Sequence, residues 1–248
     1  MLHYPYYLAD DENLQKRQEN LVDFCFSHIH PAKEKQILDI GCGNGSQTFY
    51  IAEIIGFENI IGIDLNEANI ENASKHYSSD KIIFMIDDAQ KLSTVKSYSV
   101  DIVVCIESAF HYPNKEAFLQ AVHRILKPEG QLIIADILTK SYRKGPLLRN
   151  WKKKMHYNHW TMEDYLGTME KLGFEIQIKE DITSSIIKGY EGYISWLDKA
   201  NNMRWNQLLV AKGFLHMQVI LNVILLKRRR TYCLFVCRKA TVKPTIFS

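Results

Sequence analysis

Short runs of apolar residues recur along the chain at a length typical of β-strands, and stretches of helical length separate most of them. The runs are continuous rather than alternating, as expected for strands that are buried on both faces of a sheet. They cover residues 36–40, 59–64, 81–86, 100–106, 131–137 and 174–178. The helical stretches cover residues 46–55, 67–77, 115–126 and 162–172. This alternation predicts an α/β fold with a doubly wound, parallel sheet.

The regions on either side of this core have a different pattern. Apolar residues at helical spacing predict an N-terminal helix over about 12–29 within a cap of residues 1–35. The core covers 36–183, a helical insert covers 184–230, and the segment 231–248 holds a last strand at 232–237. The longest apolar stretch, Phe214 to Leu226, is shorter than the roughly 20 residues that a membrane span needs, so no transmembrane segment is expected.

Composition narrows the class of protein. The chain has 248 residues, of which 46% are hydrophobic and 24% charged, which suits one large domain or a domain with a small lid. A net charge of +3 is too small to imply nucleic-acid binding, and none is expected. The five cysteines are scattered without a CxxC pair, so neither a disulfide framework nor a metal site is expected. A reducing, cytoplasmic location is expected for such a chain.

A glycine-rich turn follows the first strand of the core. In "LDIGCGNGSQ" three glycines alternate at Gly41, Gly43 and Gly45, and Asp64 ends the second strand. An acid at that place commonly binds the ribose hydroxyls of a ligand at the carboxyl edge of the sheet. The spacing GxGxG, with Ser46 next, differs from the GxGxxG or GxGxxA of NAD-binding proteins. Together these signals favour another nucleoside-containing ligand over a tight turn without one.

The stretch "ILDIGCGNGSQTFYIA" resembles the first motif of the class I S-adenosylmethionine (SAM)-dependent methyltransferases. The similarity continues through "IIGIDLNEANIENA", "MIDDAQKL", "VDIVVCIESAFHY" and "AVHRILKPEGQLIIADI", from about Ile37 to Ile137. The resemblance implies a Rossmann-like sheet of seven strands whose last strand is antiparallel, with residues 184–230 as a helical lid. It also implies SAM as cofactor and S-adenosylhomocysteine (SAH) as its product.

The resemblance assigns cofactor contacts residue by residue. The glycines would pass under the methionine part of SAM, with Asp39 orienting the loop or the SAM amino group. Asp64 would bind the ribose, Asp88 the adenine amino group, and Ile106 the methionine moiety through its backbone. The full set is Asp39, Gly41, Gly43, Asp64, Leu65, Asp88, Ala89 and Ile106. Two of these acids have plainer alternatives, since Asp39 could be structural and Asp88 could be a solvated turn residue.

The segment "ESAFHY" carries the candidate catalytic groups. It resembles an E-S-x-x-H pattern in sugar O-methyltransferases and tocopherol C-methyltransferases and, more distantly, cyclopropane synthases. His111 is a natural base near neutral pH. Asp136, at the end of the fifth strand, is its candidate partner or a second base, and Glu107 is a candidate for the acceptor pocket. A local structural role remains the alternative for all three.

The resemblance implies methylation of a small-molecule acceptor at oxygen, nitrogen or carbon. A protein or RNA methyltransferase, or a SAM-binding regulatory protein without catalysis, remains the alternative. The N-terminal tyrosines of "LHYPYYLADD" and the aromatic residues of the insert could face ligand or only pack. The basic clusters 151–154 and 227–230 could be solvated surface, or could give weak contact with an anionic substrate or membrane surface. The sequence does not indicate an oligomeric state.

Overall fold

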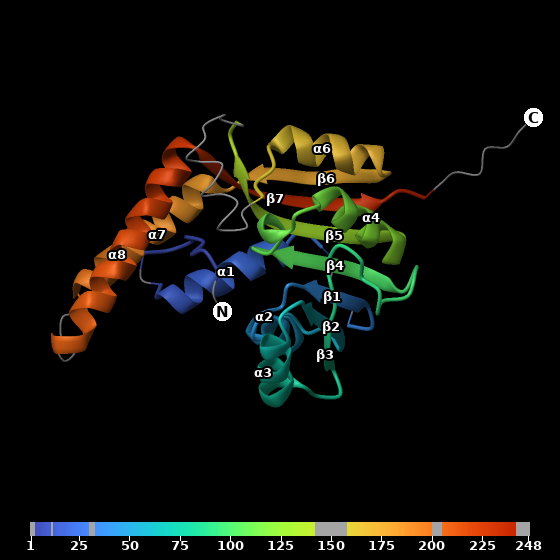
Figure 1. The fold of residues 1–248 in the computed structure, drawn as a ribbon, viewed down its shortest axis with the longest axis horizontal. Coiled ribbons are helices and arrows are strands. Elements are labelled where there is room, and N and C mark those ends of the chain that lie inside the picture. The colour runs from blue at the N-terminus through green and yellow to red at the C-terminus, as the bar shows by residue number, and fades with distance from the viewer. Residues whose placement is uncertain (1–2, 11, 30–32, 142–157, 200–204, 242–248) are drawn as a thin grey trace, which may run out of the picture.

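The protein folds around one seven-stranded sheet, with helices on both faces (Figure 1). The computed structural model describes residues 3–10, 12–29, 33–141, 158–199 and 205–241, and for 193–199 and 205–216 only the backbone. The strands are β1 (Gln36–Ile40), β2 (Asn59–Asp64), β3 (Ile82–Ile86), β4 (Val100–Ile106), β5 (Leu126–Thr139), β6 (Phe174–Asp181) and β7 (Arg230–Lys239).

The order of the strands is β3-β2-β1-β4-β5-β7-β6. The strands β3, β2, β1, β4 and β5 pair in parallel, and β7 lies antiparallel between β5 and β6. The predicted seven-stranded Rossmann-like sheet with an antiparallel last strand is therefore confirmed. Because β1 and β4 are neighbours, the chain reverses its direction across the sheet there, which is where ligands bind in open α/β sheets.

Successive side chains of the central strands enter two separate cores. From β1, Ile37 packs into one core and Leu38 into the other. The first core holds residues of α1 (Leu14–Phe26), the α2 helix (Ser46–Tyr50) with its π-turn η1 (Ile51–Ile55), and α3 (Glu67–Tyr77). The second core holds residues of α4 (Lys115–Ile125) and α6 (Met162–Lys171). Burial on both faces explains why the strands are continuous apolar runs.

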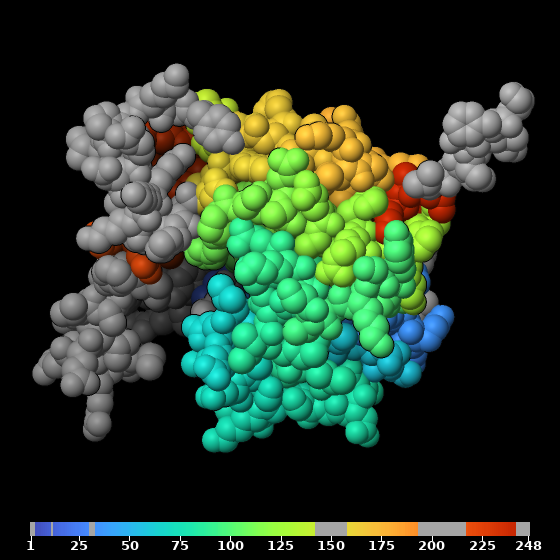
Figure 2. All heavy atoms as spheres, turned by 45° about the vertical axis from the view of Figure 1, so that its right-hand side comes forward, coloured from blue at the N-terminus to red at the C-terminus, as the bar shows by residue number. Residues whose placement is uncertain are grey.

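Two helices occupy the predicted insert, α7 (Thr183–Lys199) and α8 (Trp205–Arg228). Figure 1 shows them as a pair beyond the end of the sheet toward which the arrowheads of β1 and β4 point. Ile186, Tyr190 and Val223 join the first core, so these helices are packed onto the sheet through α1 and β7. The described residues from α3 to α6 form one continuous surface in Figure 2, from cyan through green to yellow. Whether the pair moves as a lid stays a prediction.

Candidate functional site

The turn after β1 is closely packed at Gly41 and leaves the backbone uncovered at Gly43. Gly41 has a φ of +76°, and a Cβ there would lie 1.9 Å from Ser108 Oγ. Gly43 has a φ of +54°, and a Cβ there would meet nothing within 4 Å. Both conformations favour glycine. Gly41 therefore lets the loops after β1 and β4 touch, while Gly43 leaves its backbone facing open space at the sheet edge.

Asp39 lies behind this turn, fully buried in β1. Its carboxylate accepts hydrogen bonds from Gln47 Nε2 at 2.6 Å and from Thr48 Oγ1 at 2.7 Å, in the first turn of α2. Burial raises the pKa of Asp39 to about 6, although the bonds from Thr48 and Gln47 act in the opposite direction. Asp39 thus fixes the start of α2 relative to the glycine turn.

Asp64 ends β2 and reaches back to the same turn. Its Oδ2 accepts from the Gly43 backbone N–H at 3.0 Å, and its Oδ1 accepts from Asn66 N at 2.8 Å and Asn69 Nδ2 at 3.4 Å. A carboxylate has about four lone-pair sites, so this half-buried group keeps capacity for a ligand hydroxyl. Leu65 follows it and is 71% exposed. Asp64 therefore braces the open glycine and faces the same edge.

The two acids after β3 have different surroundings. Asp87 is buried and accepts from Ser93 N and from the backbone and hydroxyl of Thr94, so it closes the turn. Asp88 is half-buried and accepts from Gln90 N at 2.9 Å. Burial acts to raise the pKa of Asp88, but the bonds from Gln90 and the charge of Lys91 outweigh it, and the pKa is lowered. Asp88 is the acid of this pair that keeps exposed surface.

Two further predicted cofactor residues lie at or just after the carboxyl ends of β3 and β4. Ala89, beside Asp88, is buried. Ile106 is the last residue of β4 and is also buried. Its backbone contact with the cofactor stays a prediction.

Glu107 follows β4 with a φ of +55°, a conformation that costs a residue with a side chain about 1–2 kcal/mol. Its Oε1 accepts from Tyr4 N at 2.7 Å and from the Tyr232 hydroxyl at 2.9 Å. Its Oε2 lies 3.4 Å from His3 Nδ1. The carboxylate therefore joins the N-terminal segment to β7 at the end of β4, an arrangement that the sequence analysis did not predict.

His111 is exposed at the end of the short helix η2 (Ala109–His111), and its ring lies 4.2 Å from that of Phe110. Asp136 lies beneath η2 and is fully buried. It accepts from the Phe110 backbone N–H at 3.1 Å and from the Tyr165 hydroxyl at 2.5 Å. Asp136 thus holds the turn that carries His111 from inside, and whether it takes part in catalysis stays a prediction.

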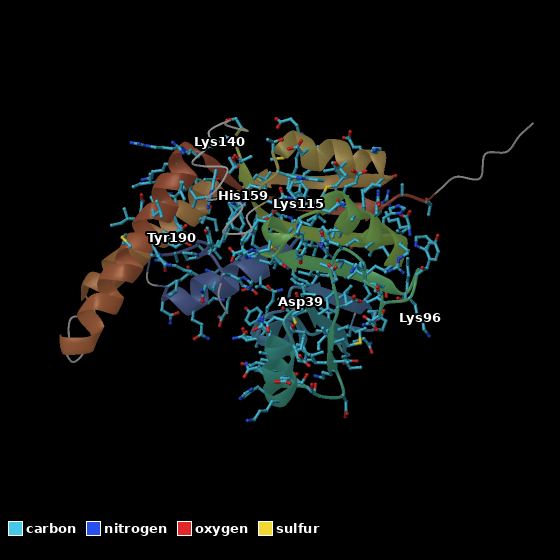
Figure 3. The ribbon with its side chains drawn as sticks, in the orientation of Figure 1. Asp39, Lys96, Lys115, Lys140, His159 and Tyr190 are labelled. Atoms are coloured by element: carbon cyan, nitrogen blue, oxygen red, sulfur yellow. The ribbon has the colours of Figure 1, made fainter. Side chains whose placement is uncertain are left out.

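Lys115 completes this buried network and was missed by the sequence analysis. Its ammonium lies 3.3 Å from Asp136 Oδ2 and donates to the carbonyl of Ala109. Burial lowers the pKa of Lys115, although the neighbouring Asp136 acts to raise it. In Figure 3, His159 lies between Lys115 and the pair α7 and α8, with Asp39 on the other side of β4. The only signal for such a lysine was an acid, Asp136, inside an otherwise apolar strand.

The N-terminal tyrosines have separate roles. The ring of Tyr4 lies 5.2 Å from that of Tyr190 and 5.7 Å from that of Tyr232. Tyr6 stacks on Phe24 instead, and the ring of Tyr7 lies under Arg17. Of these three tyrosines, only Tyr4 therefore contacts the site.

Two predictions fall outside the described side chains. They are the aromatic face of Tyr193, Trp196, Met203 and Trp205, and the basic cluster 151–154.

Among the residues that the structure describes, no group of three or more His, Cys, Asp or Glu side chains could hold a metal ion. No helix in the same part of the chain is long and apolar enough to cross a membrane. In the second basic cluster, 227–230, Lys227 pairs with Glu191 of α7 at 2.8 Å. The apolar residues Met217, Ile220, Leu221 and Ile224 are exposed on α8.

Comparisons with known proteins identify the family. A family model described as "Methyltransferase domain" matches residues 31–202. Phosphoethanolamine N-methyltransferase 3 of Arabidopsis thaliana is 29% identical over 159 residues, which cover 62% of this chain and 31% of the relative. The 2-methyl-6-phytyl-1,4-hydroquinone methyltransferase of Synechocystis is 34% identical over 118 residues, which cover 47% of this chain and 36% of the relative. The matches thus span about a third of these curated relatives.

Solved structures share the fold across nearly the whole chain. A putative sarcosine dimethylglycine methyltransferase from Galdieria sulphuraria superposes with a TM-score of 0.82 at 14% identity, covering 97% of this chain and 94% of that one. The [4+2]-cyclase SpnF superposes with a TM-score of 0.75 at 19% identity, covering 97% and 88%. At such identities the likeness shows the fold alone. The family match, which covers more than half of the chain, shows that this protein belongs to the methyltransferase domain family.

Proposed function

We propose that this protein is a SAM-dependent methyltransferase that acts on a small-molecule acceptor. The observation that carries the proposal is the open backbone at Gly43, braced by Asp64 at the edge where the sheet reverses direction. Family membership gives the class of reaction. The relatives named above are methyltransferases whose names give phosphoethanolamine and a hydroquinone as substrates.

The residues along this edge suit the parts of SAM. The open face of Gly43 leaves room for the methionine part, and Asp64 offers its remaining lone pairs to the ribose hydroxyls. Asp88 and Ala89 lie after β3, where the adenine would sit, and the buried Ile106 would contribute its backbone. When bound, SAM supplies a methyl group on a sulfonium, which is electrophilic. The protein's own task is then to align the acceptor and exclude water.

The acceptor end of the site is enclosed by elements far apart in the chain. Glu107 at the end of β4 meets the N-terminal segment at Tyr4 and meets β7 at Tyr232. The Tyr190 ring of α7 packs on Tyr4. Such an enclosure suits a small acceptor better than a protein or RNA chain.

The oligomeric state stays open. All five cysteines are buried and free, which supports a reducing, cytoplasmic location.

A SAM-binding protein without methyl transfer is the second candidate. A solved structure with this fold is titled as a [4+2]-cyclase, so the fold by itself does not determine the reaction. The two candidates agree on cofactor binding and differ on turnover. SAH release from SAM in the presence of an acceptor therefore separates them.

Calorimetry with SAM, SAH and NAD tests the cofactor. We expect SAM and SAH to bind and NAD not to bind. Asp64→Ala should weaken SAH binding by about 1–3 kcal/mol, the scale of lost hydrogen bonds to a charged group. Asp80→Ala, which removes an exposed acid just before β3, is the matched control and should leave binding unchanged. Unchanged SAH binding in Asp64→Ala would remove the ribose assignment.

A panel of acceptors tests the reaction, scored by SAH release. Phosphoethanolamine, sarcosine, a hydroquinone and geranyl diphosphate cover the acceptor chemistries in the names of the relatives and structural neighbours. Turnover with any of them supports methyl transfer to a small molecule. Tight SAM binding without turnover on this panel or on a wider metabolite extract would favour the non-catalytic candidate.

A further inference from the structure

The sequence analysis passed over His3, which the fold brings into the site. Its carbonyl accepts a hydrogen bond from Gln18 Nε2 of α1 at 2.8 Å. The next residue, Tyr4, donates its backbone N–H to Glu107 at 2.7 Å. The peptide unit between His3 and Tyr4 is therefore fixed at both its oxygen and its nitrogen, and the imidazole of His3 is held at the end of β4 rather than left in solvent.

The two ring nitrogens of His3 have different surroundings. Nδ1 lies 3.4 Å from Glu107 Oε2, and the two side chains are only 11% and 7% exposed. Nε2 is buried and has no hydrogen-bond partner. Buried polar atoms nearly always have a partner, so an orphaned one needs an explanation such as a ligand or an ordered water. A carboxylate beside one nitrogen and a second nitrogen without a partner is the arrangement of an oriented imidazole base.

His3 also lies within electrostatic reach of the glycine turn. Burial is the main influence on the pKa of Asp39 and raises it, while the imidazole of His3 acts in the opposite direction. Asp39 is in β1 and Glu107 follows β4, and these strands are neighbours in the sheet. The imidazole thus lies near the carboxyl ends of two neighbouring strands, at the edge of the sheet where the methyl donor would bind.

We propose that His3, oriented by Glu107, takes the proton of the methyl acceptor. This rests on the proposed methyltransferase function. In the step, the acceptor atom X of an X–H group forms a bond to the methyl carbon while the carbon–sulfur bond breaks and its electron pair stays on sulfur. The proton of X–H passes to His3 Nε2. The resulting imidazolium faces the Glu107 carboxylate until the proton leaves to solvent.

His111 fits this role less well in the structure. It is exposed on η2 and lies against the Phe110 ring, whereas His3 is enclosed together with a carboxylate. Glu107 also adopts a left-handed backbone conformation, and such strained positions cluster at functional sites. The proposal therefore gives Glu107 a positioning role through His3, and gives the proton transfer to His3 instead of His111.

An NMR comparison of two complexes tests the proposal without an acceptor. The Glu107 carboxylate faces His3 and also accepts from the Tyr232 hydroxyl, while Asp39 lies within electrostatic reach of the imidazole. SAM and SAH differ by one positive charge at the sulfur. If Nε2 lies close to that sulfur, the imidazole ¹⁵N resonances of His3 should differ between the SAM complex and the SAH complex.

The measurement is a ¹⁵N NMR spectrum of the full chain at one pH, free and saturated with SAM or SAH. His28 is the internal control, since its Nε2 is also buried without a partner but its ring packs on Phe24 of α1. We expect the imidazole resonances of His28 to be equal in the two complexes. Equal imidazole resonances of His3 in the SAM and SAH complexes would overturn the proposal. Failure of SAM and SAH to bind at all would instead refute the proposed function.

Variants give an independent test with whichever panel acceptor is turned over. His3→Gln should lower kcat by about 10²–10⁴-fold, change SAH affinity less than twofold, and remove the acid limb of the pH–rate profile. Glu107→Gln should lower kcat less and shift that limb. His28→Gln should behave as the wild type, and thermal melting confirms that each variant folds. Retention of kcat and the acid limb in His3→Gln, or loss of the limb in His111→Ala alone, would show that His3 is only a structural contact.

Discussion

Lys115 offers a direct test of what holds the turn after β4. Lys115 and Asp136 are both fully buried, and the ammonium also donates to the carbonyl of Ala109 in η2. Lys115→Met keeps a long apolar side chain and removes the charge. Asp136 is then left with the Phe110 N–H and the Tyr165 hydroxyl as its donors. Its negative charge stays in the core without a cation.

Removing one partner of a buried ion pair typically costs about 3–5 kcal/mol, because the other charge is left uncompensated. A domain has only about 5–15 kcal/mol of stability in total, so Lys115→Met should lie near its limit. In the double variant Lys115→Met/Asp136→Asn neither position of the pair carries a charge, and the Asn amide oxygen can still accept from Phe110 N–H. The double variant should therefore be more stable than Lys115→Met alone.

Urea unfolding at pH 7, followed by circular dichroism, measures these free energies. Lys171→Met is the matched control, since Lys171 pairs with Glu116 at 3.4 Å with its side chain 74% exposed. Exposed pairs contribute less than about 1 kcal/mol. The reasoning is wrong if Lys115→Met costs no more than Lys171→Met, or if the losses of the two single variants simply add in the double variant.

Three more outcomes follow from the geometry of the site. Gly43→Ala should weaken SAH binding in calorimetry by more than it lowers the free energy of unfolding, since its Cβ enters open space. Gly41→Ala should mainly lower the free energy of unfolding, because its Cβ meets Ser108, and equal effects of both variants on SAH affinity would contradict this. The folded pKa of Asp39 is raised to about 6, so the stability of the wild type relative to Asp39→Asn should be highest below about pH 4. This difference should fall by about 3 kcal/mol as the pH rises through 6, measured by urea unfolding without ligand. A difference that stays flat between pH 4 and 7 would argue against the raised pKa. Residues 183–228 should be cleaved by protease more slowly with SAM and acceptor than without them, and identical cleavage would argue against a moving lid.

The sheet could be predicted because its signal is local. β1 has the predicted bounds, and the helix predicted from residue 162 begins there, with Thr161 and Asp164 forming a capping box. β5 begins earlier than predicted, at Leu126, because the polar residues before Gln131 interrupt the apolar run while the backbone stays extended. The π-turn at Ile51–Ile55 was predicted as ordinary helix, since one wider turn leaves the apolar spacing almost unchanged.

The glycines and acids of the cofactor edge could be located in the sequence because each follows directly on a strand. The network around Asp136 could not, since its partner Tyr165 is 29 residues away and Lys115 is 21 residues away. Contacts to Glu107 span still more of the chain, since Tyr4 is 103 residues away from it. No periodicity links such pairs, and only the packed fold shows which buried charge meets which.

The place of β7 in the sheet has a consequence for how the chain is made. A nascent chain that has emerged only to Asp181 holds β5 and β6 but lacks the strand that separates them. The edge of β5, with its wholly buried residues from Leu132 to Leu138, is then unpaired and open to other chains. Completion of the sheet waits for the ribosome to release residues up to Lys239, so slow translation near this point would prolong exposure of an aggregation-prone intermediate.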